Sequence, residues 1–312
     1  MIVMKPPRAL ATVGIRAPLL AGPLGISGLL VLAGLLAGCG GAGADSGKPT
    51  VVASFYPLQY VAERVVGTHA EVVNLTSPGM EPHDLEMTVM QTAEVADSDI
   101  AFYQKGFQPA VDKAIAQNGP DHVVDTSEVV TLEPIGESGR EGNDPHVWLD
   151  PIRLSDIAAA FAEEMSEVDP AHAADYEVNL DSLQTELAGL DREFAAGLGK
   201  CEISTVVVSH DAFGYLGKYG LAFEAIAGLS PDAEPAPAHI AELHDLIESD
   251  AITTVFSETL ASPEMSKTIA NDLGINTAVL DPIEGLSDAT QDEDYFSLMR
   301  RNLAALQEAN QC

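Results

Sequence analysis

The sequence is poor in basic residues. Its 312 residues include 15 Lys and Arg against 48 Asp and Glu, which gives a formal net charge of -33. A surface with this balance repels phosphate backbones and anionic lipid headgroups, so nucleic acid is not expected as a partner. The charge attracts cations in general, but a solvated acidic coat that keeps the protein soluble is the simpler explanation. Charge alone therefore names no ligand.

Motifs of common enzymes are also missing. The sequence has no phosphate-binding glycine loop, no nucleophile elbow and no HExxH zinc motif. Long apolar runs are scarce, because the run from Leu24 to Leu36 is shorter than the roughly 20 residues that a membrane-spanning helix needs. No later segment comes close to that length.

The first 39 residues read as a targeting segment. Basic residues precede the apolar run, which ends in Leu36-Ala37-Gly38-Cys39. This ending resembles the lipobox of bacterial lipoproteins, which implies cleavage before Cys39 and a lipid on its sulfur. An ordinary signal peptide with a cysteine nearby is the alternative. Residues 40–48 are glycine-rich in part and are expected to form a flexible tether.

Cysteine is rare as well. Beyond Cys39 only Cys201 and Cys312 remain, and no CxxC pair is present. In an exported protein two such thiols are most simply a disulfide, which would tie the last residue to the region after a long helix. Metal ligation by cysteine is the weaker alternative, since no Cys/His cluster supports it.

That long helix is predicted over residues 169–200. Apolar residues recur there at steps of three or four and mark one helical face: Tyr176, Leu180, Leu183, Leu187, Leu190, Phe194 and Leu198. On its own the stripe fits a coiled coil equally well. The flanks argue against this, because short β-rich runs alternate with amphipathic stretches on both sides.

The predicted fold is therefore α/β with two similar lobes, residues 49–168 and 201–312, joined by the long helix. Each lobe is expected to hold a mostly parallel sheet of about four strands covered by helices. The cleft between the lobes is the expected ligand site.

Four residues are candidates for that site. His83, His210 and Asp281 follow predicted strands, where loops face the crevice of an open α/β sheet, and His146 lies in a proline-bounded loop that can reach it. Three imidazoles and one carboxylate would complete a tetrahedral shell for a divalent metal such as zinc. The other histidines lack this placement and are expected to be solvated or structural: His69, His122, His172, His239 and His244.

At these residues the chain resembles the metal-specific solute-binding lipoproteins of ABC importers, the zinc and manganese uptake group, and within it the ZnuA-like zinc-binding members. The resemblance extends from about Val51 to the end and rests on the motifs FYPL, PHDLE, DPHVWLDP, SHDAFGYL, GLSPDAEPAP and LDPIEGL. It implies metal ligands at His83, His146, His210 and Asp281, and a long helix that limits the motion of the lobes.

The resemblance also separates two metals. Manganese-type members generally carry glutamate where this chain has His210, and a harder oxygen-rich set suits manganese better, so His210 favours Zn²⁺ over Mn²⁺. One departure concerns the His-rich acidic loop of many zinc members. Residues 133–144 are short and contain no histidine, which puts any metal-scavenging role of that loop in doubt.

The resulting hypothesis is a monomeric, lipid-anchored receptor that captures Zn²⁺ outside the cytoplasmic membrane and passes it to an ABC permease, without catalysis. Glu81, Glu86 and Asp150 are candidates to orient the ligating imidazoles. Two rivals are a zinc hydrolase with Asp281 as general base and a surface adhesin that carries metal for stability.

Overall fold

The first half of the chain forms a four-stranded parallel sheet in the order β2-β1-β3-β4. The computed structural model describes residues 47–135 and 142–312. The elements of this half are β1 Thr50–Ala53, α1 Tyr56–Val66, β2 Glu71–Asn74, α2 Val89–Asp97, β3 Ile100–Tyr103, α3 Pro109–Asn118, β4 His122–Asp125, α4 Thr126–Val129, η1 Val147–Leu149 and α5 Pro151–Val168.

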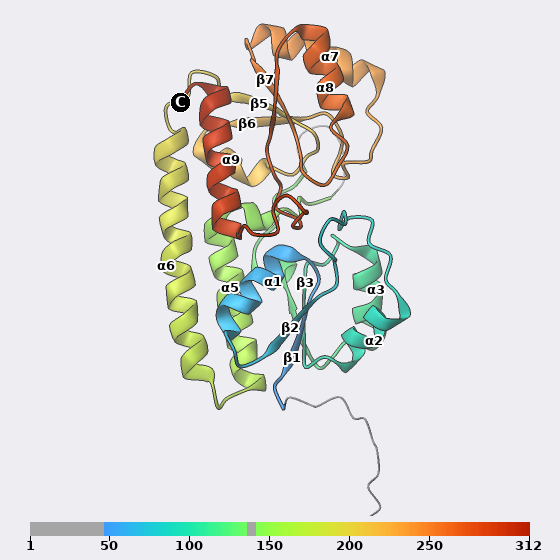
Figure 1. Ribbon diagram of the computed structural model, residues 1–312, viewed down its shortest axis with the longest axis vertical. Helices are drawn as coiled ribbons and strands as arrows, with labels where there is room; N and C mark the ends of the chain where they lie inside the picture. Colours follow the sequence, from blue (N-terminus) through green and yellow to red (C-terminus); the bar gives the residue numbers. More distant parts are fainter. Residues whose placement is uncertain (1–46, 136–141) are drawn as a thin grey trace, which may run out of the picture. The chain divides into compact units, whose positions relative to one another are not determined.

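The second half repeats this plan with the order β6-β5-β7-β8, again all parallel (Figure 1). Its elements are β5 Thr205–Val208, η2 Gly214–Tyr219, β6 Ala222–Ala225, α7 Pro237–Ser249, β7 Thr254–Ser257, α8 Glu264–Leu273, β8 Asn276–Val279 and α9 Tyr295–Asn310. The prediction of two similar α/β lobes is confirmed.

The long helix, α6, spans Ala173–Leu198 and is shorter at its start than predicted. The predicted helix starts at Asp169, but Asp169 is the residue that follows α5 and lies in the turn before α6. The Asp169 carboxylate accepts a hydrogen bond from the hydroxyl of Tyr176 and pairs with the ring of His172. Asp169 therefore closes the turn between two helices.

The apolar stripe of α6 faces both halves of the protein. Six of its seven members are buried, and Leu180 is half-buried. The helix packs against α5 and α1 of the first half and α9 of the second (Figure 1). Near its end, a Cβ on Gly197 would lie 2.9 Å from a methyl carbon of Leu303 in α9, so glycine permits this close approach. The apolar stripe packs against both lobes, so no coiled-coil partner is needed to bury it.

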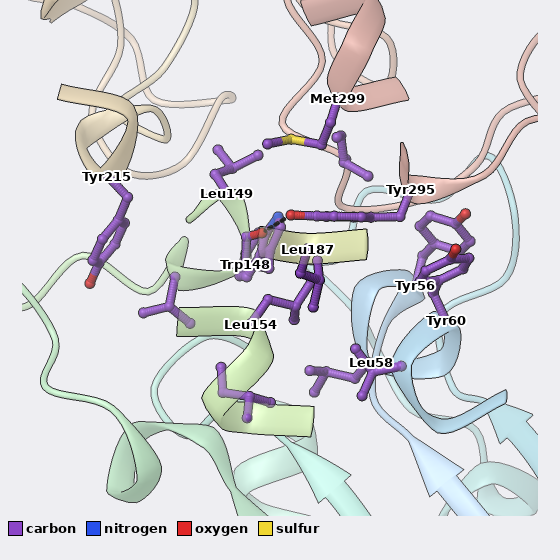
Figure 2. Packing of buried hydrophobic residues seen from close by; sticks show 14 of the residues in the cluster. Tyr56, Leu58, Tyr60, Trp148, Leu149, Leu154, Leu187, Tyr215, Tyr295 and Met299 are labelled. Atoms are coloured by element: carbon purple, nitrogen blue, oxygen red, sulfur yellow. Dashed lines mark hydrogen bonds between the residues drawn. The ribbon is translucent and has the colours of Figure 1, made fainter. Parts of the chain in front are cut away.

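One hydrophobic core continues from the first half through α6 into the second half. Figure 2 shows its centre, where Trp148, Leu187 and Tyr295 converge from three segments. The Trp148 indole donates to the carbonyl of Pro282 at 2.7 Å, and the Tyr295 hydroxyl donates to the carbonyl of Trp148 at 2.6 Å. These bonds hold η1 of the first lobe against the second lobe.

Removing the Tyr295 hydroxyl should destabilise the protein measurably. Tyr295 is fully buried, so Tyr295→Phe leaves the Trp148 carbonyl without this donor. A buried group that loses its partner costs about 1–3 kcal/mol. Urea unfolding followed by circular dichroism measures the change. A loss below about 0.5 kcal/mol would mean that water or another donor replaces the hydroxyl.

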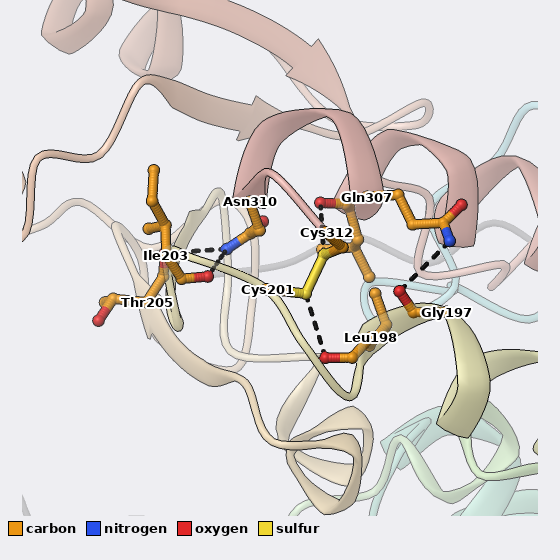
Figure 3. Close-up of a disulfide and its surroundings, with 9 residues drawn as sticks. Gly197, Leu198, Cys201, Ile203, Thr205, Gln307, Asn310 and Cys312 are labelled. Carbon is orange, nitrogen blue, oxygen red and sulfur yellow. Dashed lines mark hydrogen bonds between the residues drawn. A yellow bond between two sulfur atoms is a disulfide. The ribbon is translucent and has the colours of Figure 1, made fainter.

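The predicted disulfide is present between Cys201, just after α6, and Cys312, the last residue (Figure 3). It closes a segment with a sequence separation of 111 residues. Next to it, the side chain of Asn310 donates to the carbonyl of Ile203, and Gln307 reaches the carbonyl of Gly197. The end of α9 is thus fastened to the end of α6.

Candidate metal centre

Three histidines and one glutamate from four separate loops meet in the protein. His83 follows β2, His146 precedes η1, His210 follows β5 and Glu284 follows β8. Each offers one ligand atom, and these atoms all lie within 4.8 Å of one another. The structure brings together the three histidines that the sequence analysis singled out, and two donors come from each half of the chain.

The spacing of these atoms suits a small tetrahedral ion. Glu284 Oε1 lies 3.2 Å from Nε2 of His83, 3.2 Å from Nε2 of His146 and 3.4 Å from Nε2 of His210. The Nε2 atoms of His83 and His146 are 3.5 Å apart. In a tetrahedron with zinc bonds of about 2.0–2.1 Å, neighbouring ligand atoms lie roughly 3.3–3.4 Å apart. These four distances therefore match edges of a zinc tetrahedron.

This cage, defined as His83, His146, His210 and Glu284, is closed to solvent. The side chains of His146, His210 and Glu284 are 0% exposed and that of His83 is 11% exposed. Among the described residues, neither His210 Nε2 nor Glu284 Oε2 has a hydrogen-bond partner of good geometry. Buried polar atoms without partners are costly, and a bound cation would satisfy them.

Two further carboxylates hold the imidazoles in place. Nδ1 of His146 lies 2.7 Å from Asp144 Oδ1, and Nδ1 of His210 lies 2.9 Å from Glu258 Oε1. A carboxylate at Nδ1 fixes the proton there and leaves Nε2 free to bind a metal. Neither residue is among the candidates predicted from the sequence. Asp144 stands two residues before His146, and Glu258 directly follows β7, the same kind of position that identified His210.

None of the three residues proposed to orient the imidazoles has a hydrogen bond to a cage ring among those found in the described residues. Glu81 accepts the backbone N–H of His83, Asp150 caps α5 and pairs with Lys218, and Glu86 is exposed. Burial and then the nearby Glu284 raise the pKa of Glu81 to about 8. Glu81 thus shapes the loop that carries His83, while Asp150 and Glu86 do not reach the cage rings.

Asp281 does not join the cage, contrary to the expectation that it supplies the fourth donor. Its carboxylate accepts from the Thr259 hydroxyl at 2.7 Å and from the backbone N–H of Ile283 at 2.8 Å. Ile283 has a φ of 58°, a left-handed conformation that is unusual for a β-branched residue. Asp281 stabilises this turn, and the turn brings Glu284, three residues later, to the histidines.

The electrostatics of the cage depend on its carboxylates. Burial lowers the pKa of His210, but the carboxylates of Glu258 and Glu284 outweigh it and raise the pKa to about 10. Burial also lowers the pKa of His146, but the carboxylates of Asp144 and Glu284 outweigh burial, so the pKa is raised. Burial raises the pKa of Glu284, but the three histidines hold it well below its usual range. In the cage without a metal, the histidine rings therefore tend to hold protons and the Glu284 carboxylate tends to be ionised.

The segment between the first two histidines is tied to the second lobe. Pro134 and Asn143 form an antiparallel bridge, and the hydroxyl of Tyr215 donates to the carbonyl of Asp144 at 2.8 Å. Residues 136–141 of the short histidine-free loop lie outside the described residues.

The predicted signal peptide, Cys39 and most of the tether also lie outside the described residues. Within the described ranges, no helix is both long and apolar enough to cross a membrane.

Two parallel-sheet lobes that enclose a buried His/Glu cage define a metal-binding protein of the two-lobe solute-binding class. The chain belongs to the family described as "Zinc-uptake complex component A periplasmic" (ZnuA), whose model matches residues 51–309. The description of this family names a component of zinc uptake.

Individual relatives agree with this assignment. The chain is 32% identical over 310 residues to the high-affinity zinc uptake system protein ZnuA of Bacillus subtilis, covering 91% of this chain and 97% of that protein. It is also 32% identical to the zinc-binding lipoprotein AdcA of Streptococcus pneumoniae over 88% of this chain, but spans only 58% of AdcA. A crystal structure of the Zn(II)-bound ZnuA-like domain of AdcA matches with a TM-score of 0.74, covering 85% of this chain and 100% of that domain.

Proposed function

We propose that this protein captures Zn²⁺ outside the cytoplasmic membrane and delivers it to an ABC permease. The observation that carries the proposal is the cage, whose measured donor distances of 3.2–3.5 Å match a zinc tetrahedron. Family membership and the names of the relatives supply the transport context. The ion is cargo, bound by His83, His146, His210 and Glu284.

The donor set favours zinc over manganese. Three neutral imidazoles and one carboxylate suit a borderline metal, whereas Mn²⁺ prefers oxygen donors and higher coordination. Four protein donors also fill a tetrahedron, which leaves no position for the reactive water that a zinc hydrolase needs. We therefore infer that the protein carries zinc and does not catalyse a reaction. The geometry of the cage does not support the adhesin hypothesis.

The remaining features complete the proposal. Cleavage before Cys39 and lipidation of its sulfur would anchor a monomer to the outer face of the cytoplasmic membrane, with residues 40–48 as tether. Residues 49–168 and 201–312 would act as lobes that separate to release the ion, with α6 limiting their motion. The permease would supply the force that parts them.

Metal competition tests this function directly. The purified protein, stripped of metal, is dialysed against equal concentrations of Zn²⁺ and Mn²⁺ and its metal content is measured. We expect zinc to be bound almost exclusively, and His210→Glu to shift the balance toward manganese, because a carboxylate replaces an imidazole. Preferential uptake of manganese by the unmodified protein would overturn the assignment.

Zinc binding should release protons and weaken in acid. The pKa of His210 is raised to about 10, so its ring holds an extra proton in the metal-free cage near neutral pH, and the pKa of His146 is shifted in the same direction. Zinc requires a deprotonated Nε2, so at least one proton must leave for each ion bound. Lower pH favours the protonated rings, and affinity should fall by about 100-fold over two pH units if one proton is released.

Isothermal titration calorimetry in buffers with different ionisation enthalpies measures this proton release. The observed heat should vary linearly with buffer enthalpy, and a chelator competition at lower pH should give the weaker affinity. Heats that do not depend on the buffer would contradict the raised pKa values of the cage histidines.

A further inference from the structure

A second group of metal-binding side chains lies away from the cage. His122, Glu164 and Glu167 each offer a ligand atom, and these atoms all lie within 4.8 Å of one another. His122 begins β4, an edge strand of the first sheet, whereas the loop with His83 follows the carboxyl end of β2. The group therefore lies at the amino ends of the parallel strands, whereas the cage loops leave the carboxyl ends.

The three side chains are positioned by rigid elements. Glu164 and Glu167 are three residues apart in the last turn of α5, so they project from the same helical face. The other face of α5 is fixed in the core by Phe161 and Met165, both fully buried. His122 is held by its pairing with Ile100 in β3. This arrangement does not depend on a loop.

The electrostatics of the group call for a cation. The carboxyl end of a helix carries partial negative charge, which favours positive side chains there and disfavours carboxylates. The last turn of α5 contains no basic residue, yet it holds both glutamates. In the ion pairs of residues 47–135 and 142–312, neither glutamate pairs with Lys or Arg, and His122 is the partner of Glu164.

We propose that His122, Glu164 and Glu167 form a second, peripheral binding site for Zn²⁺. Zinc is bound by imidazole nitrogen and by carboxylate oxygen, and three protein ligands leave the fourth tetrahedral position to water. His122 Nδ1 and Glu164 Oε1 lie 2.6 Å apart, so they must separate to roughly 3.3 Å to admit the ion between them. Their side chains are 38% and 29% exposed, which leaves them room to move.

The second site should bind zinc more weakly than the cage. It supplies three protein donors in place of four, and it is open to solvent and counterions, which screen its charges. An exposed site of this kind exchanges its ion without any separation of the lobes. It would thus take up zinc from solution under conditions in which the cage is already filled.

Equilibrium dialysis of the whole chain against Zn²⁺ alone, with the bound metal counted by mass spectrometry, tests this site. We expect two ions per chain, one tight and one weaker. His122→Ala and Glu167→Gln should each lose the weaker ion and keep the tight one. His210→Ala should lose the tight ion and keep the weaker one, so failure of the cage and failure of the second site give different results.

A matched control separates a built site from general attraction to an acidic surface. His239 is 36% exposed and lies 3.9 Å from the carboxylate of Glu242, but among the described residues it belongs to no group of three ligand atoms that could hold a metal. His239→Ala therefore removes a similarly exposed histidine outside the proposed site. This variant should still bind two ions. One ion on the unmodified protein, two ions on His122→Ala, or loss of an ion from His239→Ala would each overturn the proposal.

Discussion

Replacing Glu284 by glutamine should weaken zinc binding by about 100-fold or more, since the cage loses its only charged donor. The change keeps the size and shape of the side chain, but it removes the carboxylate that lies 3.2–3.4 Å from all three imidazole Nε2 atoms. Without it, the positive ion is buried among neutral rings, which is costly in a site closed to water. Competition with a chromogenic zinc chelator measures the loss.

Asp281→Asn is the matched control for this prediction. Asp281 holds the Ile283 turn and the Thr259 hydroxyl, so its substitution acts on zinc only through the position of Glu284. A residue that orients a ligand contributes less than the ligand itself, typically about 10-fold to 100-fold. We expect Asp281→Asn to bind zinc more tightly than Glu284→Gln. The reverse order would restore Asp281 as the fourth ligand.

Removing the disulfide should lower the free energy of unfolding by about 4 kcal/mol, because a loop of this length gives roughly 4.7 kcal/mol in the chain-entropy model. The Cys201–Cys312 bond closes a sequence separation of 111 residues, which is most of the second lobe. The double substitution Cys201→Ser with Cys312→Ser tests this by urea unfolding. Its zinc affinity should match that of the unmodified protein, since neither cysteine belongs to the cage.

A reductant provides the internal control for the disulfide prediction. Treatment with dithiothreitol should destabilise the unmodified protein by the same amount and leave the double variant unchanged. If reduction had no effect, the hydrogen bonds of Asn310 and Gln307 beside the disulfide would be sufficient to hold the end of α9.

The fold could be predicted from the sequence because its signals are local and repeated. Short β-rich runs alternate with amphipathic stretches on both sides of one long stripe, and parallel sheets follow from that order. The predicted start of the long helix at Asp169 is wrong, because Asp169 followed by Pro170 fits both a helix start and a turn between helices. Only the contacts of Asp169 with His172 and Tyr176 decide between the two.

The site could be predicted in part. His83 and His210 follow strands, and that position is visible in the sequence, as is the proline-bounded loop of His146. The fourth donor could not be located in this way, because the left-handed turn at Ile283 determines which carboxylate of the segment LDPIEGL faces the rings. Backbone conformation at one buried isoleucine has no sequence pattern of its own. Asp144 and Glu258 were missed because orienting carboxylates are recognised only once the imidazoles are placed.

Trp148 gives the protein an optical reporter of its own state. It is the only tryptophan in the chain, its ring centroid lies 5.2 Å from that of His146, and its indole is bonded to Pro282 of the second lobe. Indole emission responds to charge and to solvent, so filling the cage and parting the lobes should each change its intensity or wavelength. Capture and release of the ion can therefore be followed in real time, on unlabelled protein, by the fluorescence of a single buried side chain.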